Sequence, residues 1–287
     1  MTRRYAVLAW TAAACTYVLI VLGAVVRITG SGMGCGDHWP LCNGRLIPSL
    51  SDLPTLIEWS HRLAALAVSV LVIGLAIYAF ICGRTGIPGA GPLVRPALLA
   101  AVLLVVQVLL GAVTVWLELP PAVVTLHLAT ALALLAALLV TALRASGSAP
   151  QVPSPRARRA ALAALALGVV ALLLGGATAS LGAGAACQGF PLCSGQWWPG
   201  GAASGLPQIH WLHRLAAYAL VLHLAGVAAR IRRPPAWTAL GLALAQVVVA
   251  VVMVLGALPP EWRALHAAVG TALWASLVWL AHQTRVI

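Results

Sequence analysis

The sequence EWSHRLAA at residues 58–65 returns as HWLHRLAA at residues 210–217, which is 152 residues further along the chain. The same offset joins Cys35 to Cys187, in the polar segment that precedes each copy. A second block returns after 139 residues, and it pairs Gln107 with Gln246, Pro120 with Pro259, and His127 with His266. Matches at fixed offsets indicate an internal duplication. We therefore expect two halves with the same fold.

Composition places the chain in a membrane. Hydrophobic residues make up 62% of it, charged residues make up 8%, and the mean hydropathy is +1.01, which excludes an ordinary soluble domain. An apolar helix of about 20 residues crosses the hydrocarbon layer. Eight such runs occur, at about residues 6–28, 60–82, 93–116, 122–143, 159–181, 211–230, 236–257 and 262–281. The first belongs to the duplicated frame and is too long for a signal peptide, so it counts as a span. The sequence predicts an all-α integral membrane protein with eight transmembrane helices in two pseudo-symmetric four-helix bundles.

The net charge of +12 reflects membrane topology and does not indicate a nucleic-acid partner. All seventeen basic residues are arginine, and twelve of them fall at one set of helix ends: Arg3, Arg4, Arg84, Arg95, Arg144, Arg156, Arg158, Arg159, Arg230, Arg232, Arg233 and Arg285. The other ends carry five arginines and all five acids: Arg27, Arg45, Arg62, Arg214, Arg263, Asp37, Asp52, Glu58, Glu118 and Glu261. Cytoplasmic loops are rich in Arg and Lys, so both termini are predicted to be cytoplasmic in the cell membrane. Membrane lipids with anionic headgroups are the natural partners of the basic face.

The duplication and the topology divide the chain into three segments. Residues 1–144 form an N-terminal four-helix half, and residues 159–287 form a C-terminal four-helix half. Residues 145–158 are rich in Pro, Ser and Arg, and they are predicted to be a cytoplasmic linker. An even number of helices in each half gives the halves the same orientation, as in parallel repeats.

Four cysteines lie in the predicted outer loops, as Cys35 with Cys42 and Cys187 with Cys193. Disulfides persist outside the cytoplasm, and neither spacing is the C-x-x-C of thioredoxin-like sites. We interpret both pairs as structural disulfides that pin a loop over a cofactor pocket, with thiol redox chemistry as the alternative. The remaining cysteines, Cys15 and Cys82, are expected to be apolar packing residues.

Four histidines carry the functional prediction. They stand at similar depth near the outer helix ends, where an imidazole is costly and function is the default explanation: His61, His127, His213 and His266. Hydrogen bonding between helices is the simpler alternative for any one of them. Structural zinc needs four ligands, whereas haem iron takes two axial ligands from facing helices. The sequence therefore favours two bis-histidine haems, one in each half. It contains no C-x-x-C-H motif for covalent attachment.

The other histidines receive simpler interpretations. His38, in an outer loop, and His282, near the inner end of the last helix, are expected to be solvated. His223 lies in the middle of a helix and is expected to form a hydrogen bond between helices. His210 lies on the same helix face as His213, three residues before it.

Glu58 marks an asymmetry between the halves, because it takes the place that His210 takes in the second copy. It lies three residues before His61, so both side chains can face one cavity. A carboxylate beside a cofactor can accept protons or stabilise positive charge, and the alternative is an interfacial glutamate at a helix start. Arg62 and Arg214 follow the predicted ligands, and they either bind haem propionates or extend to the interface. The asymmetry suggests that one half performs chemistry while the other keeps a resident cofactor.

The segment VVRITGSGMGCGDHWPLCNG at residues 25–44, together with EWSHR at 58–62 and the repeated histidines, resembles bacterial haem A synthase. The resemblance extends from about residue 5 to residue 282. It implies that the protein oxidises the C8 methyl group of haem O to a formyl group, which gives haem A for terminal oxidases. The sequence departs from the family at Gly36, where a proline is usual.

The resemblance also assigns the site residues. His61 and His127 would bind the substrate haem, His213 and His266 would bind a resident haem b, and Glu58 would be the catalytic carboxylate. The family's reaction passes through a hydroxymethyl group and a geminal diol, with water as the oxygen source. A bis-histidine iron has no open position for O2. Haem O is expected from haem O synthase; the electron acceptor is unknown, and a homo-oligomer is compatible with the sequence.

Three other functions stay open at this point. A dihaem electron-transfer cytochrome b would explain the histidines but not the difference between Glu58 and His210. A DsbB-like thiol–quinone oxidoreductase would explain the paired cysteines but not the histidines. A haem exporter or carrier is the third alternative.

Overall fold

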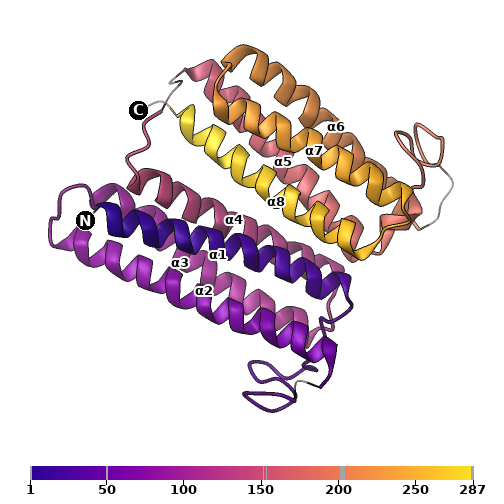
Figure 1. Cartoon of the computed structure of the whole chain (residues 1–287), viewed down its shortest axis with the longest axis horizontal. Helices are drawn as coiled ribbons and strands as arrows, with labels where there is room; N and C mark the ends of the chain where they lie inside the picture. The colour runs from indigo at the N-terminus through magenta and orange to yellow at the C-terminus, as the bar shows by residue number, and fades with distance from the viewer. Residues whose placement is uncertain (1, 50, 151, 153, 201–203, 286–287) are drawn as a thin grey trace. The chain divides into compact units, whose positions relative to one another are not determined.

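The computed structural model describes residues 2–49, 51–150, 152, 154–200 and 204–285. Eight α-helices dominate these residues (Figure 1), and a short 3₁₀-helix, η1 (Ala183–Ala186), follows the fifth. The α-helices are α1 (Thr2–Ile28), α2 (Leu53–Arg84), α3 (Gly91–Trp116), α4 (Pro121–Ala145), α5 (Pro155–Ser180), α6 (Leu206–Ile231), α7 (Pro234–Leu255) and α8 (Pro260–Gln283). Each α-helix is long and apolar enough to cross a membrane. The prediction of an all-α membrane protein with eight spans is confirmed.

The chain forms two compact units, Met1–Ala149 and Pro150–Ile287. In the first unit, α1 and α3 each pack against both α2 and α4. In the second unit, α5 and α7 each pack against both α6 and α8. Each unit is therefore a closed ring of four helices. The pseudo-symmetric relation between the units stays a prediction, as does the division of function between them.

The helices extend further into the loops than hydropathy indicates. α2 begins at Leu53 instead of near residue 60, because Asp52 caps it. The Asp52 carboxylate accepts hydrogen bonds from the Thr55 hydroxyl at 2.7 Å and the Thr55 amide at 2.9 Å. These bonds, the hydroxyl bond first, lower the pKa of the Asp52 carboxyl and favour its anionic form at the helix start. α5 likewise begins inside the predicted linker, at Pro155, because proline suits the first helical turn.

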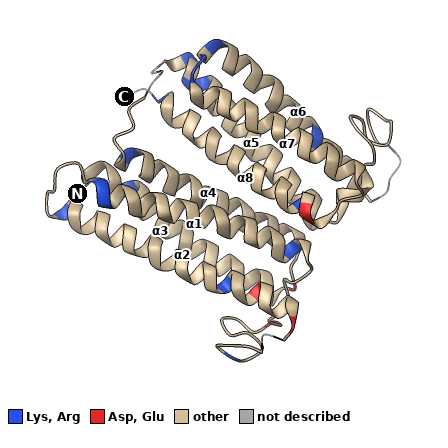
Figure 2. Cartoon of the chain, viewed as in Figure 1, with Lys and Arg blue, Asp and Glu red and all other residues tan. Residues whose placement is uncertain are grey.

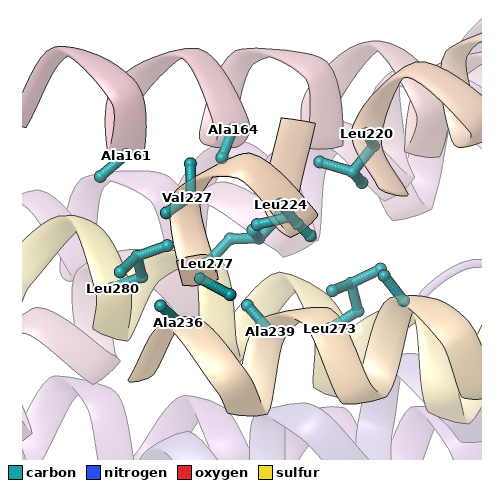
Figure 3. Close-up of a cluster of buried hydrophobic side chains, with 12 residues drawn as sticks. Ala161, Ala164, Leu220, Leu224, Val227, Ala236, Ala239, Leu273, Leu277 and Leu280 are labelled. Atoms are coloured by element: carbon teal, nitrogen blue, oxygen red, sulfur yellow. The ribbon is translucent and has the colours of Figure 1, made fainter. Parts of the chain in front are cut away.

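Small side chains bring the helices of the second unit together (Figure 3). Ala161 of α5 and both Ala236 and Ala239 of α7 are fully buried in one cluster with Leu277 of α8. A Cβ at Gly168 would come within 2.5 Å of Leu277 Cδ1, so this glycine is required for the contact as it stands. Small residues at such positions let helix backbones approach closely in a membrane.

The two Leu-Pro-Pro turns share one conformation. Leu119 and Leu258 have φ angles of 63° and 64°, and their amides donate back to the preceding helix at 2.7 Å and 2.8 Å. Each leucine also reaches the loop after the first helix of its unit. A Cβ on Gly32 would lie 2.8 Å from Leu119, and one on Gly184 would lie 3.2 Å from Leu258. Each turn therefore supports the cysteine loop of its own unit.

Charged side chains gather at the helix ends (Figure 2). Asp52, Glu58 and Glu118 lie at the end of the first unit that carries the cysteine loop, and Glu261 lies at the corresponding end of the second unit. Among the described residues, the opposite helix ends carry arginines and no acids. The side of the membrane that each end faces stays a prediction.

Candidate functional site

A disulfide closes the loop after the first helix of each unit. Cys35 is bonded to Cys42, and Cys187 is bonded to Cys193. The pairing predicted from the sequence is confirmed. At Gly36 the φ angle is +65°, a conformation that the proline usual at this position cannot adopt.

A largely buried arginine joins the first cysteine loop to α2. Arg62 Nη1 donates hydrogen bonds to the carbonyl oxygens of His38 at 2.9 Å and Leu41 at 2.8 Å. Arg62 Nε and Nη2 donate to Glu58 Oε1 at 3.1 Å and 2.6 Å. All three guanidinium nitrogens are therefore engaged, and the planar group fixes the loop against the helix.

Glu58 is the acceptor at the centre of this arrangement, and it is only 4% exposed. Its Oε1 accepts from Arg62, and its Oε2 accepts from the amide of Cys35 at 2.9 Å. A buried carboxylate needs a charged partner and hydrogen bonds of this kind. Glu58 thus connects the disulfide loop to the helix that carries His61.

The second unit repeats the connection with an imidazole in place of the carboxylate. Arg214 donates to three loop carbonyls, those of Gly189 at 2.8 Å, Leu192 at 2.9 Å and Cys187 at 2.5 Å. Arg214 Nε also donates to His210 Nε2 at 3.3 Å. His210 must then carry its proton on Nδ1, which donates to the Ala183 carbonyl at 3.1 Å. His210 is a loop-holding residue in this geometry.

The loop contacts of Arg62 and Arg214 were not predicted from the sequence. A signal was available, because each arginine follows its acceptor by four residues, Glu58 in one copy and His210 in the other. That spacing places two side chains on one helix face. Propionate binding by the two arginines stays a prediction.

His213 of α6 and His266 of α8 face each other in the second unit. Their ring centroids are 6.3 Å apart, and the ring planes meet at 78°. Two metal–nitrogen bonds of ~2.0 Å would hold two ligand nitrogens about 4 Å apart. The centroid separation of 6.3 Å leaves room for a metal ion between these two rings.

His213 is also held in the tautomer that a metal ligand needs. Its Nδ1 lies 2.8 Å from the carbonyl oxygen of Ala171. A carbonyl only accepts, so Nδ1 carries the proton and Nε2 keeps its lone pair. A carbonyl partner of this kind fixes the ring and makes it a stronger ligand.

A glutamine contacts the other predicted ligand in each unit. Gln107 Nε2 lies 3.1 Å from His127 Nε2, and Gln246 Nε2 lies 3.1 Å from His266 Nε2. The sequence shows both glutamines at the repeat offset, but it assigns them no role. His61, His127 and His266 each have a buried Nδ1 without a hydrogen-bond partner. Such atoms are uncommon in protein interiors.

Glycines leave room for two of the imidazoles. A Cβ on Gly23 would lie 3.1 Å from His61 Cε1, and one on Gly175 would lie 2.8 Å from His213 Cε1. The two glycines are related by the same 152-residue offset as the two histidines. The space for these rings is therefore part of the duplicated frame.

His61 and His127 both belong to the first unit, and His213 and His266 both belong to the second. In the second unit the two imidazoles lie against each other, whereas the pairing of His61 with His127 stays a prediction. Donor type, spacing and tautomer fit a haem iron in the second unit. Among the described residues, no group of three or more His, Cys, Asp or Glu side chains is placed to hold a metal ion.

The remaining histidines lie apart from these pairs. His38 is exposed, as expected. His223 Nε2 lies 2.8 Å from the carbonyl of Ala160 on α5, which confirms the predicted bond between helices. The prediction that His282 is solvated is wrong, since it is 5% exposed. α8 continues to Gln283, so His282 stays within the packed part of the helix.

Comparisons with known proteins agree with this arrangement. Residues 6–278, from α1 to α8, match the cytochrome oxidase assembly protein family COX15-CtaA. A heme A synthase from Halalkalibacterium halodurans is 33% identical over 72% of this chain and 69% of its own length. A heme A synthase from Shouchella clausii is 36% identical over 72% of this chain and 70% of its own length.

A longer relative matches as well. A protoheme IX farnesyltransferase from Thermus thermophilus is 34% identical over 97% of this chain and 48% of its own length. The chain thus spans about half the length of that relative. Because the family match covers nearly all of the sequence, this chain belongs to the COX15-CtaA family of cytochrome oxidase assembly proteins.

Proposed function

We propose that this protein is a membrane oxidoreductase that converts the C8 methyl group of haem O to the formyl group of haem A. The family match and the relatives named heme A synthase support this reaction. The observation that carries the proposal is the difference between the units. Both contain a histidine pair, but only the first places a buried carboxylate, Glu58, one turn before a predicted ligand.

The first unit would bind the substrate haem through His61 and His127. The second would hold a resident haem b through His213 and His266, and haem b supplies a redox centre when it is bound. The 6.3 Å ring separation supports this second assignment. So does the bond from His213 Nδ1 to Ala171, which leaves Nε2 free.

Glu58 would take protons released during the oxidation. Replacing C–H bonds of the methyl group by C–O bonds, with water as the oxygen source, removes protons and electrons. An external acceptor takes the electrons, and a positioned base takes the protons. Arg62, 2.6 Å from Glu58 Oε1, stabilises the carboxylate before transfer. The Cys35 amide fixes the other oxygen, so the loop orients the base.

Arg62 and Arg214 would stand at the outer edge of the two haem sites. Their guanidinium groups already bind loop carbonyls in each unit. A haem propionate at either site would therefore share the arginine with the loop. In this proposal each arginine connects the position of the loop to the position of the haem.

The arginine-rich helix ends would face the cytoplasm, with the cysteine loops on the outer side. Haem O would arrive within the membrane from the enzyme that forms it. The Thermus relative supports that partner, because about half of a longer chain named protoheme IX farnesyltransferase resembles this protein.

Pigment extraction and mass analysis of the purified full chain test the proposal. We expect haem b together with haem O, its hydroxymethyl derivative or haem A. Incubation with haem O and an artificial electron acceptor should yield haem A. In oxygen-18 water the hydroxymethyl intermediate should carry the label. A protein that binds two haem b molecules and leaves haem O unchanged would be an electron-transfer cytochrome, and the proposal would be wrong.

A further inference from the structure

We infer that Gln107 and Thr130 act together to keep haem binding in the first unit reversible, and we call them the exchange pair. The second unit lacks this pair, and haem there stays bound. The inference rests on the proposed function, in which the first unit must release its product while the second keeps a cofactor. The side chains involved would not bind iron themselves. They would either compete with iron for a histidine ligand or support that ligand.

The first observation is a difference around the two glutamines. Gln107 Oε1 accepts a hydrogen bond from the Thr130 hydroxyl, while its Nε2 donates to His127. The residue at the repeat offset from Thr130 is Val269, which has no hydroxyl. Gln246 Oε1 is buried there without a partner. Both the oxygen and the nitrogen of the Gln107 amide are therefore hydrogen-bonded, whereas the oxygen of the Gln246 amide is not.

The second observation concerns the amide nitrogen of each glutamine. Gln246 Nε2 has two acceptors on one residue, His266 Nε2 at 3.1 Å and the His266 carbonyl oxygen at 3.0 Å. For Gln107 Nε2, within the described part of the chain, the acceptor is His127 Nε2 alone, at 3.1 Å. If His266 Nε2 bound iron, Gln246 Nε2 would keep the His266 carbonyl as its partner. If His127 Nε2 bound iron, the Gln107 amide would lose its acceptor, and an unpaired buried donor is costly.

The third observation concerns the opposite ligand of each pair. His213 Nδ1 is bound to the Ala171 carbonyl at 2.8 Å. His61 Nδ1 is buried without a partner, although His61 occupies the corresponding place in the first copy. A histidine whose second nitrogen donates to a carbonyl is better oriented and more basic as a ligand. The second unit thus has the stronger ligand.

The three differences described above act in one direction. In the first unit, the Gln107 amide would compete with iron for the lone pair of His127 Nε2. Because Thr130 fixes this amide, it can rebind the imidazole as soon as an iron–nitrogen bond breaks. In the second unit, Gln246 competes less, and the Ala171 carbonyl supports His213. The ligands are alike in the two units, but the groups behind them favour exchange in one and retention in the other.

Transfer of haem to excess apomyoglobin tests the inference without any measurement of turnover. The full chain is loaded with haem b in both units, and loss is followed by absorbance. We expect a fast and a slow phase. His127→Ala should remove the fast phase, and His266→Ala should remove the slow one. Thr130→Val should slow the fast phase about fivefold, the weight of one hydrogen bond. Val269→Thr should accelerate the slow phase by a similar factor.

Two variants serve as matched controls. Thr130→Ser keeps the hydroxyl and should keep the wild-type fast phase. Thr125→Val removes a hydroxyl on the same helix that bonds only to the Pro121 carbonyl, and it should change neither phase. If Thr130→Val fails to fold, Val269→Thr decides, because it replaces a methyl group by a hydroxyl of similar size.

The outcomes separate this inference from the function on which it rests. Haem in both units with transfer rates that ignore Thr130→Val and Val269→Thr would overturn the exchange pair and leave the proposed function standing. So would a fast phase that belongs to the second unit. Wild-type protein that binds haem in neither unit would overturn the proposed function itself.

Discussion

Glu58 has two kinds of partner, and they imply two separate consequences of changing it. Its bonds to Arg62 and to the Cys35 amide hold a loop, and an uncharged acceptor of the same shape keeps part of that structure. Its proposed chemistry needs a group that can take a proton, which an amide cannot do at neutral pH. The conservative replacement therefore distinguishes holding from chemistry.

Glu58→Gln should keep both haems and the loop contacts that one amide oxygen can accept, but lose most formation of haem A. We expect a loss of roughly 10²-fold or more, the usual weight of a positioned general base. The measurement is haem A formed per loaded protein. His210→Gln is the matched control, and it should reduce the rate less, because His210 only holds its loop. Near-normal haem A formation by Glu58→Gln would leave this residue with a structural role alone.

His213→Ala or His266→Ala should each remove the stably bound low-spin haem from the second unit, because iron would lose one of two axial ligands. The absorption spectrum of the reduced protein measures this. His38→Ala is the control, since its side chain is exposed in a loop. An unchanged low-spin spectrum in both single variants would refute the assignment.

The sequence is informative about which residues matter and less so about what they touch. Repeat offsets identify the four paired histidines and Glu58 as members of one frame. They do not reveal that Arg62 and Arg214 bind loop carbonyls, because those carbonyls belong to irregular backbone with no periodic signal. The contacts of Gln107 and Gln246 with histidines depend on how neighbouring helices are rotated. Hydropathy does not fix that rotation.

At the scale of elements, each predicted ligand depends on the helix beside it. α5 approaches α6 closely enough that Gly175 leaves just the space that the His213 ring occupies. Hydropathy locates both helices but misplaces the start of α6 by five residues, at 211 instead of Leu206. The first two turns of α6 carry Gln208 and His210, and these polar residues lower the local hydropathy, so the start of the helix is missed.

Gly175→Ala should displace the His213 ring, because the new Cβ would lie 2.8 Å from Cε1. We expect a loss of ~1–3 kcal/mol in stability, the usual cost of overpacking, and an altered low-spin haem signal. Thermal unfolding and absorbance measure the two effects. Gly226→Ala on α6 is the control, since open space surrounds its Cβ position. Equal behaviour of the two variants would contradict the proposed packing.

Removing the first disulfide with Cys35→Ser and Cys42→Ser should destabilise the loop by ~2–3 kcal/mol, as expected for a short closed loop. Haem loading and melting temperature should fall more than turnover per loaded protein. Cys15→Ser removes a free cysteine and serves as the control. A double variant that is stable and fully loaded but inactive would instead indicate thiol chemistry.

At the scale of the whole molecule, each unit has most of its arginines at the end opposite its cysteine loop (Figure 2). Hydropathy and charge predict this arrangement well, because both follow from the cost of placing polar groups in hydrocarbon. The mutual placement of the two halves has no comparable signal in the sequence, since helix–helix contacts in a membrane depend on shape.

Reporter fusions test the orientation. Alkaline phosphatase inserted after Pro48 should be active, because we place that loop outside the cytoplasm. Green fluorescent protein at the C-terminus should fluoresce, because we place that end inside. The reverse pattern would show that the arginine distribution has been misread.

The paired loop connections also bear on how duplicated copies can diverge. Arg62 is satisfied by a carboxylate, and Arg214 is satisfied by an imidazole, while each holds the same kind of loop through backbone carbonyls. Because the arginine can donate to either partner, the position four residues before it tolerates substitution. One descendant of an ancestral repeat could therefore gain or lose a carboxylate without loss of its fold. Such tolerance gives natural selection a route from two equal cofactor sites to one catalyst and one permanent redox centre.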